Sequence, residues 1–111
     1  MQSREQLVTR ALREVGAVGA GQTPSAEDYE AMDAEVEPIM ADLAQRNIWT
    51  WGDPDQIDDA AAVHLAKIIA NSAARQFGNV PDDSVRLYNE ARLRELRVVI
   101  LSGQPQTTDY Y

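Results

Sequence analysis

The residues of this chain that could do chemistry are few and scattered. His64 is the one histidine among 111 residues, and there is no cysteine to act as a nucleophile or a thiolate ligand. His64 falls near Ala61 and Leu65 on one predicted helical face, where a lone histidine is more often a packing or interface residue than a base. No serine has a base nearby in the sequence. These residue types predict no catalytic site.

Two further patterns match known sites only in part. The spacing G-x-x-G-x-G at residues 16–21 follows a predicted helix rather than a strand and has no lysine, so it does not predict phosphate binding. The acidic run that starts at Asp53 lacks a calcium loop's glycine and glutamate, because Asp58 and His64 occupy those positions. We therefore expect no enzyme activity, no cofactor and no metal site.

Arginines and tryptophans offer a different kind of chemistry, that of binding another protein. Four arginines lie on one predicted helix near the C-terminus: Arg86, Arg92, Arg94 and Arg97. Phosphate contact is a weaker interpretation than pairing with carboxylates of a neighbouring subunit, because the chain carries a net charge of −8. Trp49 and Trp51 stand in a connector whose aromatic side chains we expect to be exposed. They are either a plug at the end of the fold or anchors of the same interface.

Four predicted helices must position these residues. Their ends are marked by capping and stop residues: Ser3 with Gln6, Gly16, Ser25, Asn47, Gly78, and Asp82 or Asp83. With caps included, the helices span about residues 3–16, 25–47, 57–77 and 82–101. Pro38 lies inside the second helix and should kink it.

The fourth helix is apolar around most of its circumference. The core of so short a chain can cover one side of it, so the other side implies a partner, most often a second copy of the chain. The prediction is an all-α fold, a small bundle of about four helices at residues 1–102, with an extended, flexible C-terminal arm at residues 103–111. The longest apolar run is four residues and no secretory signal is present, so we expect a soluble protein made in a cytoplasm.

Parts of the chain resemble the head–tail connector (adaptor) proteins of tailed bacteriophages, including the packaged-DNA stabilisation or tail accessory factor type. The resemblance rests on Ala-Leu-Arg-Glu-Val-Gly at residues 11–16 and on Gly-Gln-Thr-Pro-Ser-Ala-Glu-Asp at residues 21–28. It extends to Asn-Ile-Trp at residues 47–49 and to the alanine-rich stretch 66–78 before Val80 and Pro81.

This resemblance implies a structural virion protein. The family forms a homo-oligomeric ring, usually twelve-fold, beneath the portal protein, joins the capsid to the tail and extends the DNA channel. The implied partners are further copies of the chain, the portal protein and a tail or tail-completion protein, with DNA only passing through and no membrane. The implied location is the head–tail interface of the virion, after synthesis in the host cytoplasm.

The resemblance also suggests roles for two other groups of residues. The segment 25–55 holds nine carboxylates against Arg46 alone, which is either a solvated helix face or a wall that repels DNA phosphates. The candidates for a channel-facing position are Glu27, Glu30, Asp33 and Glu37. The candidates for a portal-binding arm are Gln104, Pro105, Gln106, Thr107, Thr108, Asp109, Tyr110 and Tyr111.

Two interpretations from other classes remain open. One is a small phage DNA-binding or DNA-packaging recognition subunit, which would gather its arginines on one surface and bind DNA with a steep salt dependence. The other is a helical regulatory dimer such as an antitoxin, which would form a small fixed oligomer and would not bind portal.

Overall fold

The computed structural model describes residues 1–19 and 21–101, and the side chains as far as residue 99. The described part contains four α-helices, α1 (Arg4–Glu14), α2 (Ala26–Gln45), α3 (Asp59–Ser72) and α4 (Asp83–Leu101), and the short 3-10 helix η1 (Ala74–Phe77). The predicted all-α fold is therefore confirmed for these residues. The predicted arm at residues 103–111 lies outside them.

The ends of α1 and α2 follow their predicted capping residues. The Ser3 hydroxyl accepts a hydrogen bond from the Gln6 backbone, while the Gln6 side chain accepts one from the Ser3 backbone. The Ser25 hydroxyl accepts from the Asp28 backbone at the start of α2. Beyond the two C-terminal ends, Gly16 and Asn47 have φ values of 76° and 57°, the left-handed conformation that ends a helix. Between its ends, α2 continues through the exposed Pro38.

The third predicted helix differs from the observed one at both ends. It begins at Asp59 rather than at residue 57, because the Asp58 carboxylate caps it by accepting hydrogen bonds from the backbone of Ala60 and Ala61. Ile57 is instead paired with Gln2 through two backbone hydrogen bonds of 2.8 Å. At the other end α3 stops at Ser72, and the chain tightens into η1 before Gly78 (φ 79°) ends the segment as predicted.

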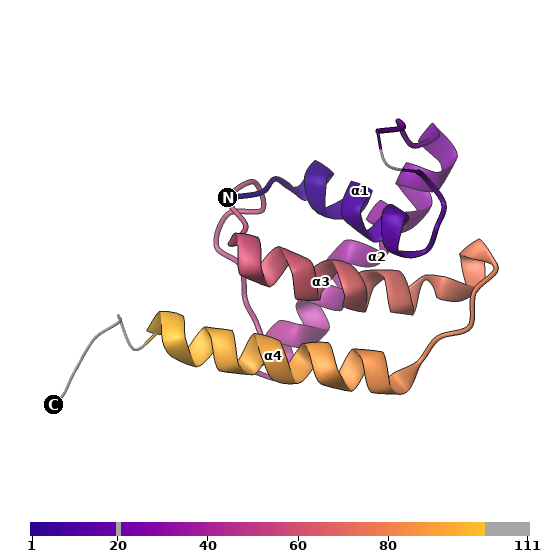
Figure 1. The fold of residues 1–111 in the computed structure, drawn as a ribbon. Coiled ribbons are helices and arrows are strands. Elements are labelled where there is room, and N and C mark those ends of the chain that lie inside the picture. The colour runs from indigo at the N-terminus through magenta and orange to yellow at the C-terminus, as the bar shows by residue number, and fades with distance from the viewer. Residues whose placement is uncertain (20, 102–111) are drawn as a thin grey trace, which may run out of the picture.

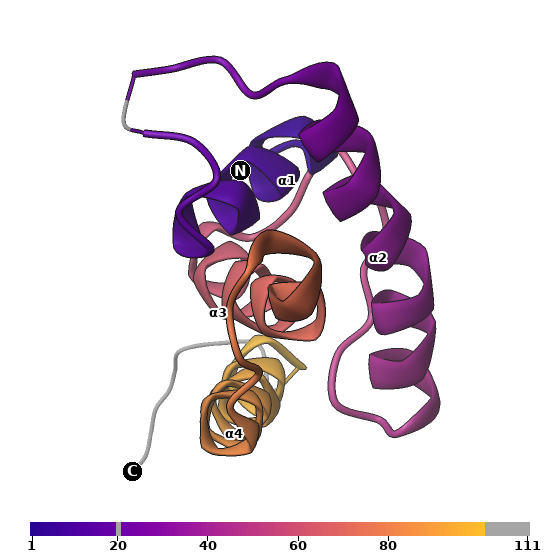
Figure 2. The same cartoon turned by 90° about the vertical axis from the view of Figure 1, so that its right-hand side faces the viewer.

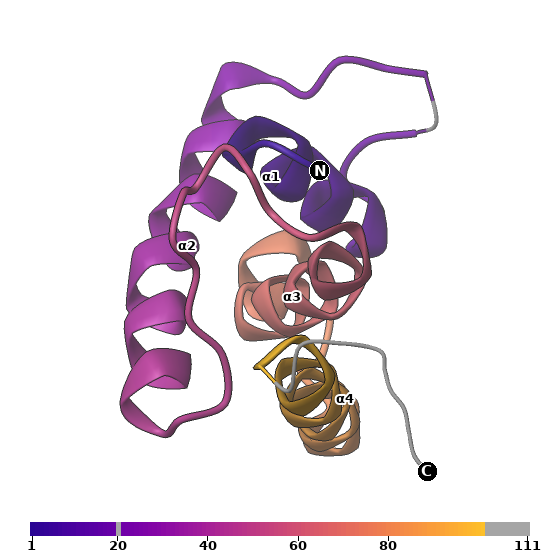
Figure 3. The same cartoon turned by 90° about the vertical axis from the view of Figure 1, so that its left-hand side faces the viewer.

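Helix α3 lies at the centre of the molecule. Figure 2 shows α1 on one side of α3, α4 on the opposite side, and α2 running past both from a third direction. The view from the other end agrees with this arrangement (Figure 3). Both α1 and α2 contact α3 and each other, whereas α4 packs against α3 and against no other described helix (Figure 1). Helix α4 is thus an outer layer of the bundle.

The core is made of aliphatic side chains from α1, α2 and α3, together with the first residues of the connector after α2. Ile48 and Trp49 are buried, because the turn at Asn47 directs the backbone of both toward the carbonyl of Leu43. The expectation of exposed aromatics was therefore wrong for Trp49, which is 7% exposed. None of the described helices is both long enough and apolar enough to cross a membrane.

Candidate assembly surface

Helix α4 has two faces of opposite character. Its inner face, against α3, buries Asn89, Glu90 and Leu93. On the opposite side the large apolar side chains Leu87, Tyr88 and Val98 are 53%, 63% and 67% exposed, and Ala91 lies exposed between them. We call these four residues the outer ridge. The prediction that intramolecular packing leaves one apolar side of this helix uncovered is confirmed.

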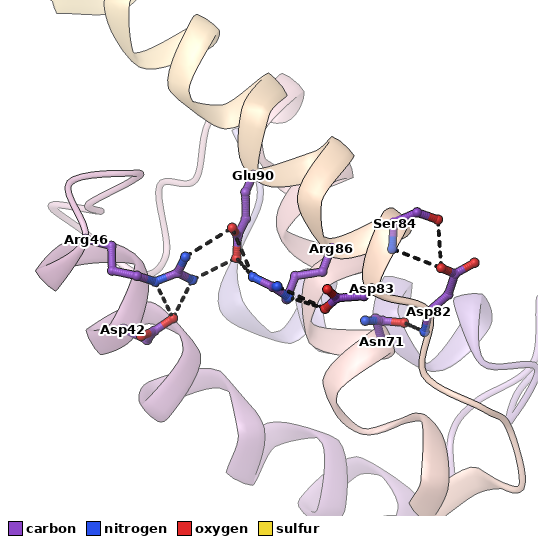
Figure 4. A network of polar contacts seen from close by, with 8 residues as sticks. All are labelled: Asp42, Arg46, Asn71, Asp82, Asp83, Ser84, Arg86 and Glu90. Atoms are coloured by element: carbon purple, nitrogen blue, oxygen red, sulfur yellow. Dashed lines mark hydrogen bonds and ion pairs between the residues drawn. The ribbon is translucent and has the colours of Figure 1, made fainter.

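A network of charged side chains fixes the inner face of α4 (Figure 4). Arg46, which follows the end of α2, reaches across and donates two hydrogen bonds to the Glu90 carboxylate, at 3.1 and 2.7 Å. Arg86, one turn before Glu90 on α4, donates to the same carboxylate at 3.2 Å. Asp42 accepts from Arg46, and Asp83 accepts from Arg86, at 2.6 and 2.9 Å respectively. These contacts couple α4 to the end of α2.

The network keeps Glu90 ionised although it is almost fully buried. The hydrogen bond from Arg46 lowers the pKa of the Glu90 carboxyl below its ordinary value, against the opposing effect of burial. The hydrogen bond to Glu90 is likewise the main reason that the pKa of Arg46 is raised. Glu90 is therefore a buried carboxylate whose charge is compensated by two arginines rather than a candidate acid or base.

The single histidine belongs to the same inner layer. His64 Nδ1 on α3 lies 2.9 Å from Asn89 Oδ1 on α4, and the Asn89 amide donates to the Val85 carbonyl at 2.8 Å. Because that amide nitrogen is committed to a carbonyl, the Asn89 oxygen faces the imidazole, and Nδ1 is the donor. His64 is thus a packing residue that joins α3 to α4, as its position in the sequence suggested.

The four arginines assigned to a subunit interface do not share one environment. Arg86 is held within the chain by Glu90 and Asp83, and Arg97 donates to the Asn47 carbonyl at 2.8 Å. Arg92 pairs with Glu95, three residues further along the same helix, at 3.0 Å. The Arg94 side chain is exposed and makes no hydrogen bond or ion pair with another described residue. Arg94, beside the outer ridge, is therefore the arginine best placed to meet a partner.

The two tryptophans also differ from each other. Trp49 belongs to the core cluster, and Trp51 is half-buried against it. Together with Met1, Ile57 and Arg97 they line a surface cavity of about 250 Å³. This position favours the role of a plug at the end of the bundle for Trp49, and leaves part of Trp51 accessible.

The acidic residues of α2 divide into paired and unpaired ones. Arg4 on α1 donates hydrogen bonds to Asp33, at 2.9 Å, and to Glu37. The side chains of Glu27 and Glu30 are exposed and have no hydrogen-bonding or ionic partner among the described residues. Two of the four proposed channel-facing acids therefore serve first to bind α1 to α2.

Sequence reasoning missed Glu90, the one buried charged residue in the described chain. Two signals were present in the sequence. Arg86 and Glu90 are four residues apart on a helix, and Arg46 is the one basic residue in a long acidic segment. Neither signal shows that the two arginines meet at the same carboxylate, because that depends on how α2 and α4 are each placed against α3.

Comparison with known proteins adds no relative: no protein-family model, no curated protein and no solved structure matches the chain. Within residues 1–19 and 21–101, no group of three or more histidine, aspartate or glutamate side chains is arranged to hold a metal ion. The candidate arm, residues 104–111, lies outside the described part of the chain. Among the described residues, the outer ridge of α4 is therefore the surface that best indicates a function.

Proposed function

We propose that the protein is a structural subunit that forms a homo-oligomeric ring beneath the portal of a tailed bacteriophage and joins the capsid to the tail. The observation that carries this proposal is the outer ridge of α4, which lies opposite the buried face of the same helix. Several exposed large apolar side chains on one helix face are typical of a protein–protein contact. An assembly role explains why these side chains are exposed on one face of the helix.

The resemblance of residues 11–28 to head–tail connector proteins supports the particular assembly. It suggests a ring of about twelve copies with the portal on one side and a tail or tail-completion protein on the other. The net charge of −8 agrees with a channel through which DNA moves without adhering, since like charges repel phosphates. Residues 104–111 remain the candidate arm for binding the portal.

Reconstitution with the portal protein tests the proposal. The purified chain is mixed with portal rings, and particles are examined by electron microscopy, with the expectation of an added ring on one side of the portal. Leu87→Asp should abolish this ring, because it places a charge in the apolar contact. Val80→Asp is the matched control: Val80 is 87% exposed but lies in the turn before α4, so this variant should still bind.

Two outcomes would replace the proposal with an alternative. Failure to bind portal, combined with a DNA affinity that falls steeply with salt, would favour the DNA-recognition subunit. A small oligomer of fixed size without portal binding would favour the regulatory dimer.

A further inference from the structure

A second exposed helix face, on α2, complements the outer ridge of α4. Small apolar side chains occupy its middle, at Ala34, Pro38 and Ala41, all of which are exposed. Carboxylates flank them, at Glu27, Glu30 and Glu37. Because the central side chains are small, another helix could approach this face closely. We call these six residues the α2 outer face.

The two faces match in length, and they complement each other in the size of their side chains and in charge. Helix α2 has 20 residues and α4 has 19, so each is about 30 Å long. The outer ridge presents large apolar side chains and the unpaired Arg94, whereas the α2 outer face presents small side chains and the unpaired Glu27 and Glu30. Large side chains of one helix pack between small ones of another, and opposite charges at the margin favour the correct partner.

We infer that the outer ridge of α4 in one copy packs on the α2 outer face of the next copy. This inference rests on the proposed ring and names the contact that builds it. The two faces belong to different helices of one chain, so the contact is head-to-tail and can be repeated from copy to copy until a ring closes. A two-fold contact between two α4 helices would instead leave Glu27 and Glu30 unused and would offer Arg94 only Glu95, which already pairs with Arg92 on its own helix.

The inference changes the role assigned to the acids of α2. The unpaired Glu27 and Glu30 then lie between subunits, on the face that receives Arg94 of a neighbour, rather than on a channel wall. Arg94 is the one arginine of the four whose side chain has no partner among the described residues, and this contact gives it a carboxylate partner.

Disulfide trapping tests this contact, because the chain has no cysteine of its own. Ala34 and Ala91 are exposed and lie near the midpoints of α2 and α4, so they meet whether the two helices pack parallel or antiparallel. Under mild oxidation the double variant Ala34→Cys/Ala91→Cys should give a ladder of covalent dimers, trimers and larger species. Ala91→Cys alone should remain monomeric on a non-reducing gel. The matched control is Ala34→Cys/Ala60→Cys, because Ala60 is exposed at the start of α3, away from the outer ridge.

Adding Arg94→Glu to the trapping variant should reduce the ladder to monomers at low salt, and high salt should weaken this effect. Circular dichroism spectra that match the unsubstituted chain establish that each variant is folded. Dimers from Ala91→Cys alone would show an α4–α4 contact and overturn the inference. A ladder no stronger than that of the control would overturn it as well.

The portal experiment separates this inference from the proposed function. A ladder from a chain that adds nothing to the portal would support the contact and contradict the proposed function. A ring on the portal, combined with no trapping between Ala34→Cys and Ala91→Cys, would support the function and overturn the contact.

Discussion

Helices α1 and α4 both pack against α3, but different chemistry holds each of them. Helix α1 contributes Leu7, Val8, Ala11 and Leu12, whose side chains are fully buried, and it also contacts α2. Helix α4 contributes one fully buried apolar side chain, Leu93, next to the polar Asn89 and Glu90. One helix is held mainly by apolar burial, and the other by Leu93 and the partly buried Leu96 beside a polar layer.

The difference indicates which part of the molecule is easiest to displace. Apolar burial contributes free energy in proportion to the area removed from water. A buried ion pair contributes less, because the cost of removing charges from water offsets much of their attraction, but it requires a specific alignment of its partners. We therefore expect α4 to be the less stable layer, and its orientation, with the outer ridge exposed, to depend on Glu90.

The largest effect on stability is expected from a substitution in the apolar contact between α1 and the core. Leu12→Ala should lower the free energy of unfolding by about 2–5 kcal/mol, because it leaves a cavity in the core cluster to which α1 contributes. Chemical denaturation followed by circular dichroism measures this loss. The matched variant Leu93→Ala removes the same atoms from α4, and we expect it to increase amide hydrogen exchange mainly in α4. Uniform exchange across all four helices in Leu93→Ala would contradict the separation of the two layers.

Breaking the polar layer should have a smaller effect on stability. Glu90→Ala removes the carboxylate shared by Arg46 and Arg86 and should cost about 1–3 kcal/mol, the usual cost of leaving partly buried donors without an acceptor. Faster hydrogen exchange in α4, with α1 unchanged, is the expected signature. Glu95→Ala is the control, since its pair with Arg92 is exposed and should contribute at most ~1 kcal/mol. Equal losses in both variants would contradict the importance of Glu90.

The same layer should be sensitive to acid. The pKa of Glu90 is lower in the folded protein than its ordinary value of 4.5. Its contribution to stability is therefore present above about pH 4.5 and is lost as the pH falls through the lower, folded-state pKa. Unfolding free energies measured between pH 3 and pH 7 should fall less steeply at the acidic end in Glu90→Gln. Identical slopes in both proteins would show that Glu90 does not govern this loss.

The smallest effect on folding is expected on the outer ridge. Leu87→Ala should change the free energy of unfolding by at most about 0.5 kcal/mol, because Leu87 is already exposed. The same variant should reduce self-association, measured by sedimentation at high protein concentration. A large loss of stability in this variant would mean that the ridge serves the fold of the single chain instead.

Much of the fold could be predicted from local signals. The capping box of Ser3 and Gln6, the Ser25 cap and the left-handed ends at Gly16 and Gly78 all act within one turn of a helix, so the sequence contains the whole interaction. The prediction was less accurate around α3, where the backbone pairing of Ile57 with the distant Gln2 delays the start of the helix. The burial of Trp49 was missed for the same reason, since it depends on where the chain turns after α2.

The sequence by itself determined the helical class, most helix ends and the spread of apolar residues around most of the fourth helix, because these follow from residue types at short spacing. Only the tertiary structure decided which side of α4 is covered and which arginines are already paired. Arg46 and Glu90 are 44 residues apart, and Arg4 and Asp33 are 29 apart. Such contacts form only when separate helices pack, and this packing leaves Arg94 and the outer ridge exposed.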